Sequence, residues 1–394
     1  MLSFVCEELE SEVIPLTNCV VEGLNQCDIF TQNDTFFQEW QQVIIEIGNL
    51  LEKKYHISAE SEIIKSLEDD CELLFELSVR PSRDALKRLL SSLNGFESII
   101  RKNIIEKDVG VSIVAIMKDE GRYLDEFICY HLCVGIEHFF LYDNESTDNT
   151  MEVLQPYIDK GYVTYIDCPG ERVQQFAYND ALSRFEYETS YMAFIDLDEF
   201  IVPVAPIETV PDAVNSIIEA QKQNPYRWKK AGGIGVNWLL YGTSNNVDPV
   251  AGLMLESYLY RASEDDIGNC HIKSIVNPRV TKSFPRSSHS VEYISDEYST
   301  ISERGSCIYD SPFFFDASFS KLRLHHYISK SETEYLNKLC QRGWPDQTHV
   351  QKPKDSPDVI SRLNLAKNEY NLVYDDTTLR YVDDIKKRIE LIRS

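Results

Sequence analysis

The sequence predicts an α/β protein with a mostly parallel, doubly wound sheet, preceded by an all-helical N-terminal domain. Up to about residue 105, apolar residues recur with helical spacing. At Val109 the pattern changes, because "VGVSIVAIM" is a continuous apolar, β-branched run of the kind found in strands covered on both faces. Strand and helix patterns then alternate as far as residue 196. Such an alternation builds a parallel sheet with helices on both faces.

The N-terminal domain, residues 1–105, is expected to contain helices at 36–51 and 58–77 and a third helix that begins at Ser82, after Pro81. Their apolar stripes are typical of an ordinary bundle core. The alternative is a partner surface, including an interface for a homo-oligomer. The charged stretch 101–108 marks the junction to the next domain.

The following domain, residues 106–345, carries the alternating pattern. Strands are expected at 109–117, 137–143, 161–167 and 191–196, with helices at 121–135, 144–158 and 174–188 between them. Further strands are expected at 232–244, 253–262 and 271–280, and a last strand and helix at 322–344. Residues 346–394 are expected to form a helical tail packed on this domain.

Composition excludes several classes of protein. The chain has 39 Lys and Arg against 64 Asp and Glu, a formal net charge of −25, which argues against nucleic acid as a partner. No apolar run approaches the length of a membrane span, so no integral membrane segment is expected. The 10 cysteines include no C-x-x-C pair, which favours a reducing compartment, and we expect a cytoplasmic protein.

Polar residues follow the strands where ligands bind in open α/β sheets, outside their carboxyl ends. They are Lys118 and Glu120, Asp143 and Asn144, and Asp196 and Asp198. Asp196 and Asp198 form an Asp-x-Asp pair after a buried strand, and oxygen ligands of this kind suit Mg²⁺ or Mn²⁺. The alternative is that the pair only caps the next turn. No dinucleotide-binding G-x-G-x-x-G and no P-loop follows the first strand of the predicted sheet.

Six stretches carry a resemblance to a known family. They are "IVAIMKDEGRYLDEFICYHLCVGIEHFFLYDNESTDNT", "AYNDAL", "YMAFIDLDEFIVP", "NWLLYGTS", "KSIVNPRV" and "HHYISKSETEYLNK..RG". Together they resemble glycosyltransferase family 92 and related enzymes of the glycosyltransferase 2 clan. The resemblance implies a GT-A fold, a nucleotide-sugar donor such as a UDP-sugar, and Mn²⁺ or Mg²⁺. The acceptor would be a hydroxyl of a glycan, a lipid-linked glycan or a protein, and transfer would proceed with inversion.

The same resemblance assigns roles to individual residues. Asp196 and Asp198 match the D-x-D motif, and His326 is the expected third metal ligand. Glu256 is the candidate catalytic base, with Asp265 and Asp266 as alternatives, and Asp198 is counted beside it as catalytic. The expected substrate-binding residues are Lys118, Glu120, Asp143, Asn144, Asn179, Asp196, Lys273 and Arg342.

Several of these residues, considered one at a time, could also have a purely structural role. Lys273, Lys330 and Arg342 are typical of solvated surface charges, and His326 of a packed histidine. Phe200, Trp238 and Tyr241 could stack on the sugar or belong to the core.

Two other functions use similar residues. A nucleotidyltransferase or metal-dependent phosphoesterase would also use paired acids and an ion. A non-catalytic nucleotide-sugar-binding scaffold would use the N-terminal helices as its interaction surface.

Overall fold

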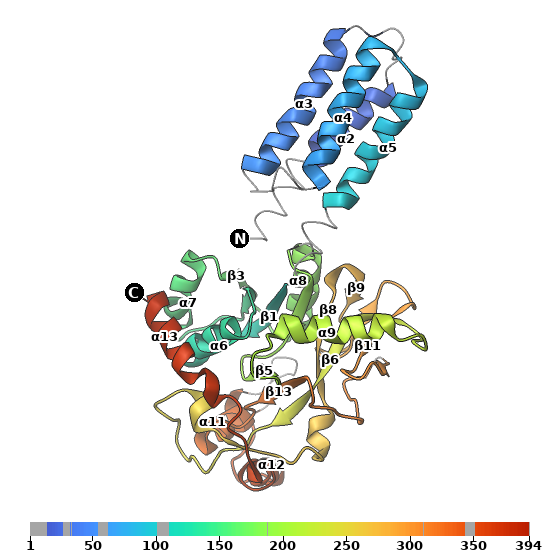
Figure 1. The fold of residues 1–394 in the computed structure, drawn as a ribbon. Coiled ribbons are helices and arrows are strands. Elements are labelled where there is room, and N and C mark those ends of the chain that lie inside the picture. The colour runs from blue at the N-terminus through green and yellow to red at the C-terminus, as the bar shows by residue number, and fades with distance from the viewer. Residues whose placement is uncertain are drawn as a thin grey trace. The chain divides into compact units, whose positions relative to one another are not determined.

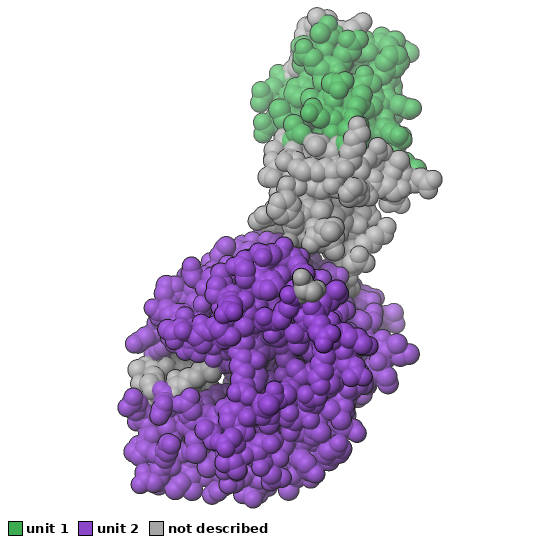
Figure 2. Space-filling model, turned by 90° about the vertical axis from the view of Figure 1, so that its left-hand side faces the viewer, with its two compact units in different colours: residues 1–108 green, residues 109–394 purple. Residues whose placement is uncertain are grey.

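The computed structural model describes residues 14–26, 32, 34–53, 62–100, 110–186, 188–309, 311–342 and 351–393. The chain divides into two compact units, residues 1–108 and 109–394 (Figure 2). The first is helical and the second contains a mixed sheet, so the predicted class, a sheet preceded by N-terminal helices, is confirmed.

The first unit contains four described helices, α2 (Ile14–Gln26), α3 (Asp34–Lys53), α4 (Glu62–Val79) and α5 (Arg83–Ile100) (Figure 1). Their apolar stripes meet in one core that includes Leu24, Ile44, Leu74 and Leu89. Helix α2 was not predicted, because its short sequence carries a proline and several polar residues and resembles a loop.

The main sheet of the second unit has the order β12-β11-β6-β8-β4-β1-β2-β3, with β13 joined to β6 and β5. Its strands are β1 (Val111–Met117), β2 (His138–Asp143), β3 (Val163–Asp167), β4 (Tyr191–Phe194), β5 (Glu199–Pro203), β6 (Lys230–Leu240), β8 (Ile272–Val276), β11 (Tyr298–Ile301), β12 (Cys307–Ile308) and β13 (Leu322–His326). Strands β1 to β4 are parallel, β8 runs antiparallel to β4 and β6, and β13 runs parallel to β6. The sheet is therefore mixed, with a parallel half formed by β1 to β4.

Two layers of helices cover this sheet (Figure 1). On one face lie α6 (Gly121–Cys133), α7 (Thr150–Asp159), α9 (Val210–Gln223) and α13 (Val382–Arg393). On the other lies α8 (Gln174–Phe185). Strand β1 shows why its sequence is apolar throughout: Ile113 packs toward the first layer and Val114 toward the second, as expected for a strand with no solvent face.

Shorter elements complete the unit. They are α10 (Met254–Ser257), α11 (Glu332–Asn337), the π-helical segment η5 (Lys338–Arg342), α12 (Pro357–Lys367), the pair β9 (Thr281–Ser283) and β10 (Glu292–Tyr293), and the pair β7 (Tyr260–Arg261) and β14 (Val373–Tyr374). The 3₁₀ turns are η3 (Ile267–Cys270), η4 (Pro278–Val280), η6 (Glu369–Asn371) and η7 (Leu379–Tyr381). Strand β14 and helix α13 place residues after 351 in the second unit.

The strand predicted over 253–262 is wrong, because its first half forms helix α10. The carboxylate of the buried Glu126 accepts the backbone amides of Met254 and Leu255, each at 2.7 Å. These bonds satisfy two amides at the start of a helix, which have no partner within the helix itself. The stabilising group lies on α6, far away in the sequence, so the local pattern could not reveal it.

Within the described ranges, no helix combines the length and the apolar character that crossing a membrane requires.

Candidate active site at the carboxyl end of the sheet

Asp196, Asp198 and Glu199 form a tight turn that joins β4 to β5 at the carboxyl end of β4. The Glu199 amide donates to the Asp196 carbonyl at 3.0 Å, and the Glu199 carboxylate accepts the Asp196 amide at 2.8 Å. Glu199 is fully buried and holds the turn together, which leaves both aspartates to face other groups. We call residues 196–199 the acidic turn.

Each aspartate of the acidic turn faces a lysine. Lys273 Nζ, from β8, lies 3.0 Å from Asp196 Oδ2, and Lys338 Nζ, at the start of η5, lies 2.7 Å from Asp198 Oδ2. Gln174, at the start of α8, donates to Asp196 Oδ1 at 3.0 Å. The reading of Lys273 as a solvated surface charge is wrong: its side chain is 1% exposed.

His326 reaches the acidic turn from β13, because its backbone lies opposite Glu199 in the β5–β13 pairing. Its Nε2 lies 3.5 Å from Asp198 Oδ1, and its Nδ1 lies 3.8 Å from Glu199 Oε1. The structure thus brings together Asp196, Asp198, Lys273 and His326, which the sequence placed at one site.

Burial and neighbouring charges set the protonation of this cluster. Burial alone would raise the pKa of Asp198, but Lys338 and His326 hold that pKa well below its ordinary value. Burial and the two adjacent aspartates raise the pKa of Glu199 well above its ordinary value, although Lys273 opposes them. Burial also lowers the pKa of His326, and Asp198 only partly offsets this effect. At neutral pH, Asp198 is therefore ionised and His326 uncharged.

The cluster suits a hard divalent ion in its chemistry. In the described part of the chain no group of three or more His, Cys, Asp or Glu side chains is arranged to hold a metal ion. Asp198 and the uncharged His326 are nevertheless adjacent donors, and His326 Nδ1 faces Glu199 without a hydrogen-bond partner. Ions of this type take one or two carboxylates and complete their shell with substrate phosphates. The pair Asp198 and His326 fits that arrangement, with Asp196 beside it.

Lys330 links the acidic turn to the end of β1. Its Nζ lies 3.2 Å from Glu120 Oε2 and 3.9 Å from the centre of the Tyr123 ring, and its charge contributes to lowering the pKa of Asp198. Lys330 is buried, with a backbone φ of +51°, a left-handed conformation that non-glycine residues rarely adopt. The interpretation of Lys330 as a solvated surface charge is therefore wrong. Lys330 pairs with Glu120 and its charge acts on Asp198, so it connects Glu120 with the acidic turn.

The ends of β1 and β2 form a second polar group. Asp143 Oδ1 accepts the Ser146 amide and hydroxyl, and its Oδ2 accepts the Tyr165 hydroxyl at 2.8 Å. Asn144 donates to the carbonyl oxygens of Cys168 and Gly170 at 2.9 and 2.8 Å. Lys118 is exposed directly after β1. The expected substrate-binding residues Lys118, Asp143 and Asn144 thus occupy the β1–β3 side of the acidic turn.

Asn179, expected to bind substrate, and Glu256, expected to be the catalytic base, form their described contacts away from the acidic turn. Asn179 uses both ends of its amide on the backbone of Phe284, which fastens α8 to the segment after β9. Glu256 accepts the Leu253 amide at 3.0 Å and pairs with Lys386 of α13 at 2.7 Å. None of the contacts described for Glu256 joins it to the acidic turn.

Arg342, a further expected substrate-binding residue, ends η5, and its side chain lies outside the described residues.

The aromatic candidates for sugar stacking divide into two kinds. Phe200 and Tyr241 are at most 1% exposed and belong to the core, so the stacking hypothesis is wrong for both. Trp238 is only partly buried, and its ring centre lies 4.4 Å from that of His326.

The substrate-binding and metal-ligating residues expected from the sequence did not include Glu199, Gln174 or Lys338, although Glu199 and Lys338 stand inside the quoted motifs. Glu199 carried the clearest signal, since it directly follows the Asp-x-Asp pair. Nothing in the local sequence marks Gln174, which reaches Asp196 only because α8 covers that face of the sheet.

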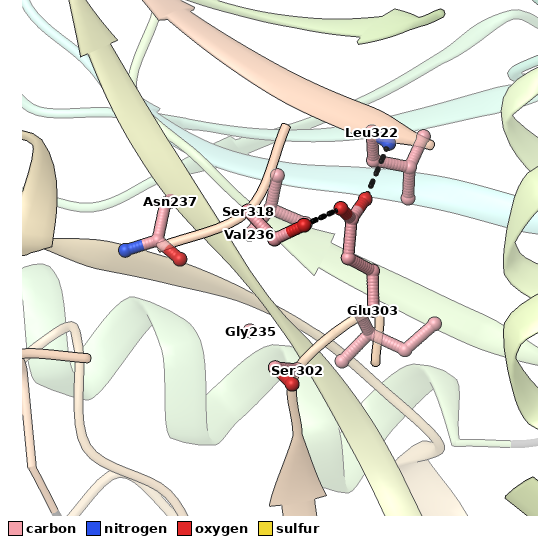
Figure 3. A pocket seen from close by; sticks show the side chains of 8 residues that line it. Gly235, Val236, Asn237, Ser302, Glu303, Ser318 and Leu322 are labelled. Atoms are coloured by element: carbon pink, nitrogen blue, oxygen red, sulfur yellow. Dashed lines mark hydrogen bonds between the residues drawn. The ribbon is translucent and has the colours of Figure 1, made fainter. Parts of the chain in front are cut away.

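A small cavity near β13 is not a substrate site (Figure 3). It measures about 10 Å³, which is room for a single water molecule. Its lining includes Glu303, whose carboxylate accepts the hydroxyl of Ser318 and the amides of Ser320, Lys321 and Leu322. Glu303 therefore fixes the start of β13, the strand that carries His326.

Comparison with known proteins identifies the family. The profile of glycosyltransferase family 92 matches residues 107–303, half of the chain. The chain belongs to glycosyltransferase family 92. This confirms the family predicted from the sequence, and the matched range contains the acidic turn and Lys273.

The family 92 relatives are distant. A glycosyltransferase family 92 protein of Arabidopsis thaliana is 26% identical over 258 residues, which are 60% of this chain and 43% of the relative. The galactan beta-1,4-galactosyltransferase GALS3 of the same plant is 36% identical over 105 residues, 24% of this chain and 20% of the relative. The chain thus spans less than half the length of either curated relative.

Solved structures show a weaker likeness. S. aureus TarS 1–349 in complex with UDP is 17% identical and superposes on 43% of this chain and 47% of that chain, with a TM-score of 0.27. At that score the superposition supports no conclusion about the site.

Proposed function

We propose that this family 92 protein transfers a sugar from a UDP-sugar to a hydroxyl group of a glycan, with inversion and with the help of a divalent ion. The observation that carries the proposal is the acidic turn at the carboxyl end of β4, paired with Lys273, Lys338 and His326. That edge of an open α/β sheet is where nucleotides and their phosphates bind.

The protein groups have distinct roles in this proposal. Asp198 and His326 would hold Mn²⁺ or Mg²⁺, which supplies positive charge to the leaving diphosphate. Lys338 is free to pair with a phosphate oxygen once Asp198 takes another partner. Lys273 fixes Asp196 in place, since it is buried between Asp196 and Glu199. Charges held in position before reaction are the main source of stabilisation at such sites.

The name of one relative suggests which donor and acceptor to test first. A relative named as a galactan beta-1,4-galactosyltransferase makes UDP-galactose and β-1,4-linked galacto-oligosaccharides the first substrates to try. The expected substrate-binding residues Asp143 and Asn144 lie on the β1–β3 side and would bind the nucleoside there, so the acceptor would approach from the β6–β8 side.

The test is a transfer assay with the purified chain. UDP-galactose, UDP-glucose and UDP-N-acetylglucosamine are each incubated with β-1,4-galactopentaose, in MnCl₂ or in EDTA, and released UDP and lengthened product are measured. We expect one donor to be used, loss of turnover in EDTA, and inversion seen in the product by NMR. Failure to bind or consume any of these donors would contradict the proposal.

The same series of assays distinguishes a nucleotidyltransferase from a glycosyltransferase. Incubation with nucleoside triphosphates and sugar phosphates would then release pyrophosphate, and the UDP-sugars would stay intact.

A further inference from the structure

A line of aromatic rings runs from the acidic turn to the protein surface. The Trp238 ring lies 4.4 Å from His326, the His271 ring stacks on Trp238 at 4.5 Å and 15°, and Phe313 contacts His271 at 4.5 Å. Phe315 continues the line at 6.2 Å from Phe313. We call Trp238, His271, Phe313 and Phe315 the aromatic wall.

The outer end of the aromatic wall is exposed. Phe313 is 37% exposed and Phe315 is 71% exposed, whereas His326 at the inner end is 4% exposed. Contiguous apolar side chains at the surface are a recognised mark of ligand-binding grooves.

The backbone behind the wall is fixed. The Phe314 amide donates to the Cys270 carbonyl at 2.7 Å, and the Ile272 amide donates to the Pro312 carbonyl at 3.1 Å. Asn237 on β6 donates to the Phe314 carbonyl at 3.0 Å. These bonds join residues 312–314 to the start of β8 and to β6, so the backbone that carries Phe313 is ordered before any ligand binds. A surface that is already ordered loses little conformational entropy on binding.

The wall suits an uncharged ligand with apolar faces. Burial lowers the pKa of His271, so its imidazole is neutral at pH 7 and the wall presents no net charge. A pyranose ring carries C–H groups on its faces and hydroxyls on its edge, and its faces pack on aromatic rings. Trp238 Nε1 is buried and has no hydrogen-bond partner among the described residues.

The position of the wall separates it from the predicted nucleotide side. Its residues come from β6, from the start of β8 and from the segment that precedes β13, on one side of β4 in the sheet order. Asp143 and Asn144 lie at β2, on the other side of β4. A ligand on the wall therefore reaches His326 from the side opposite the nucleoside.

We infer that the aromatic wall is the acceptor subsite and binds a neutral oligosaccharide along Phe315 and Phe313, with its reactive end at Trp238 and His326. This inference rests on the proposed function, because it assigns the acceptor to the same site.

The experiment compares the full chain with the double variant Phe313→Ala/Phe315→Ala. The first readout is the KM for β-1,4-galactopentaose at saturating UDP-galactose, and the second is hydrolysis of UDP-galactose without acceptor. The third is saturation-transfer NMR with galactopentaose and cellopentaose in the absence of donor. We expect the acceptor KM to rise about tenfold and the NMR signal to fall, while hydrolysis stays unchanged.

Controls separate the possible failures. Phe313→Tyr/Phe315→Tyr keeps the rings and should retain the parent KM. Trp228→Ala removes a ring that is 92% exposed in the loop after α9, outside the wall, and should change nothing. An unchanged KM in the alanine variant, or no oligosaccharide signal from a chain that hydrolyses UDP-galactose, would overturn the inference. If no donor binds, the proposed function fails. The NMR titration contains no donor, so it still shows whether the aromatic wall binds an oligosaccharide.

Discussion

Asp198 has two partners, Lys338 at 2.7 Å and His326 at 3.5 Å, and its backbone carbonyl accepts the Tyr327 amide at 2.8 Å. The main-chain bond fixes the residue whatever its side chain holds. The carboxylate could therefore exchange Lys338 for a ligand while the backbone stays in place.

We predict that Asp198→Asn lowers UDP-sugar turnover by about 100-fold or more, in line with the loss of one preorganised charged group. Asparagine keeps the volume of aspartate but leaves Lys338 without its charged partner, so the melting temperature should also fall. Steady-state kinetics and a thermal melt check both expectations. Glu256→Gln is the matched control and should retain donor hydrolysis, since Glu256 pairs with Lys386 away from the acidic turn. Equal losses in the two variants would contradict this assignment.

Burial of His325 should make the free energy of unfolding decrease as the pH falls. The ring is fully buried beside Tyr241, and burial lowers its pKa to about 3. The unfolded residue has a pKa of about 6.5. Between these values the unfolded chain binds a proton that the folded chain does not, so stability falls as the pH falls. The loss from this residue is about 1.4 kcal/mol for each pH unit.

Urea denaturation between pH 7 and pH 5 measures that slope. His325→Leu should make the free energy of unfolding depend less steeply on pH, whatever its effect at pH 7. An identical slope in both proteins would show that His325 does not titrate in this way.

At the scale of elements, β13 positions His326 and is itself held by Glu303. The Glu303 carboxylate accepts three consecutive backbone amides, at Ser320, Lys321 and Leu322. Such amides, left without an acceptor inside the fold, cost about 1–3 kcal/mol. The register of β13 against β5 then determines which residue faces Glu199.

We predict that Glu303→Ala lowers the free energy of unfolding by about 1–3 kcal/mol and also reduces turnover, because β13 loses its anchor. Urea denaturation and kinetics of the same preparation measure the two effects. Glu297→Ala is the control, since the Glu297 side chain forms an exposed ion pair with Lys230 and the substitution leaves its backbone hydrogen bonds in place. A Glu303 variant as stable as the parent would refute the role of this anchor.

The elements differ in how well the sequence predicted them. The strands from β1 to β4 were predicted, because a buried strand and an amphipathic helix each leave a periodic pattern. Helix α10 was not, because its start depends on Glu126 of α6. The burial of the site's lysines could not be predicted for a similar reason, because Lys273 and Lys330 are buried by contacts with residues far away in the sequence.

At the scale of the whole molecule, the two compact units have separate cores. Leu24, Ile44 and Leu74 belong to the core of the first unit, and the sheet packs its own layers in the second. The order of the strands in the sheet could not be predicted in full, since the antiparallel β8 and the return of β13 beside β5 depend on long-range packing.

We predict two unfolding transitions in differential scanning calorimetry, one for each core, because a unit with its own core unfolds cooperatively by itself. A chain of residues 109–394 should keep the transition that a UDP-sugar shifts upward. A single transition in the full chain, lost on removal of residues 1–108, would contradict separate cores.

The most direct test of the account is Mn²⁺ binding in the presence of UDP, followed by electron paramagnetic resonance of the free ion. We expect the parent chain and Glu256→Gln to take up Mn²⁺ when UDP is added, and Asp198→Asn to leave the ion free. Uptake by Asp198→Asn equal to that of the parent would show that the acidic turn does not hold the ion.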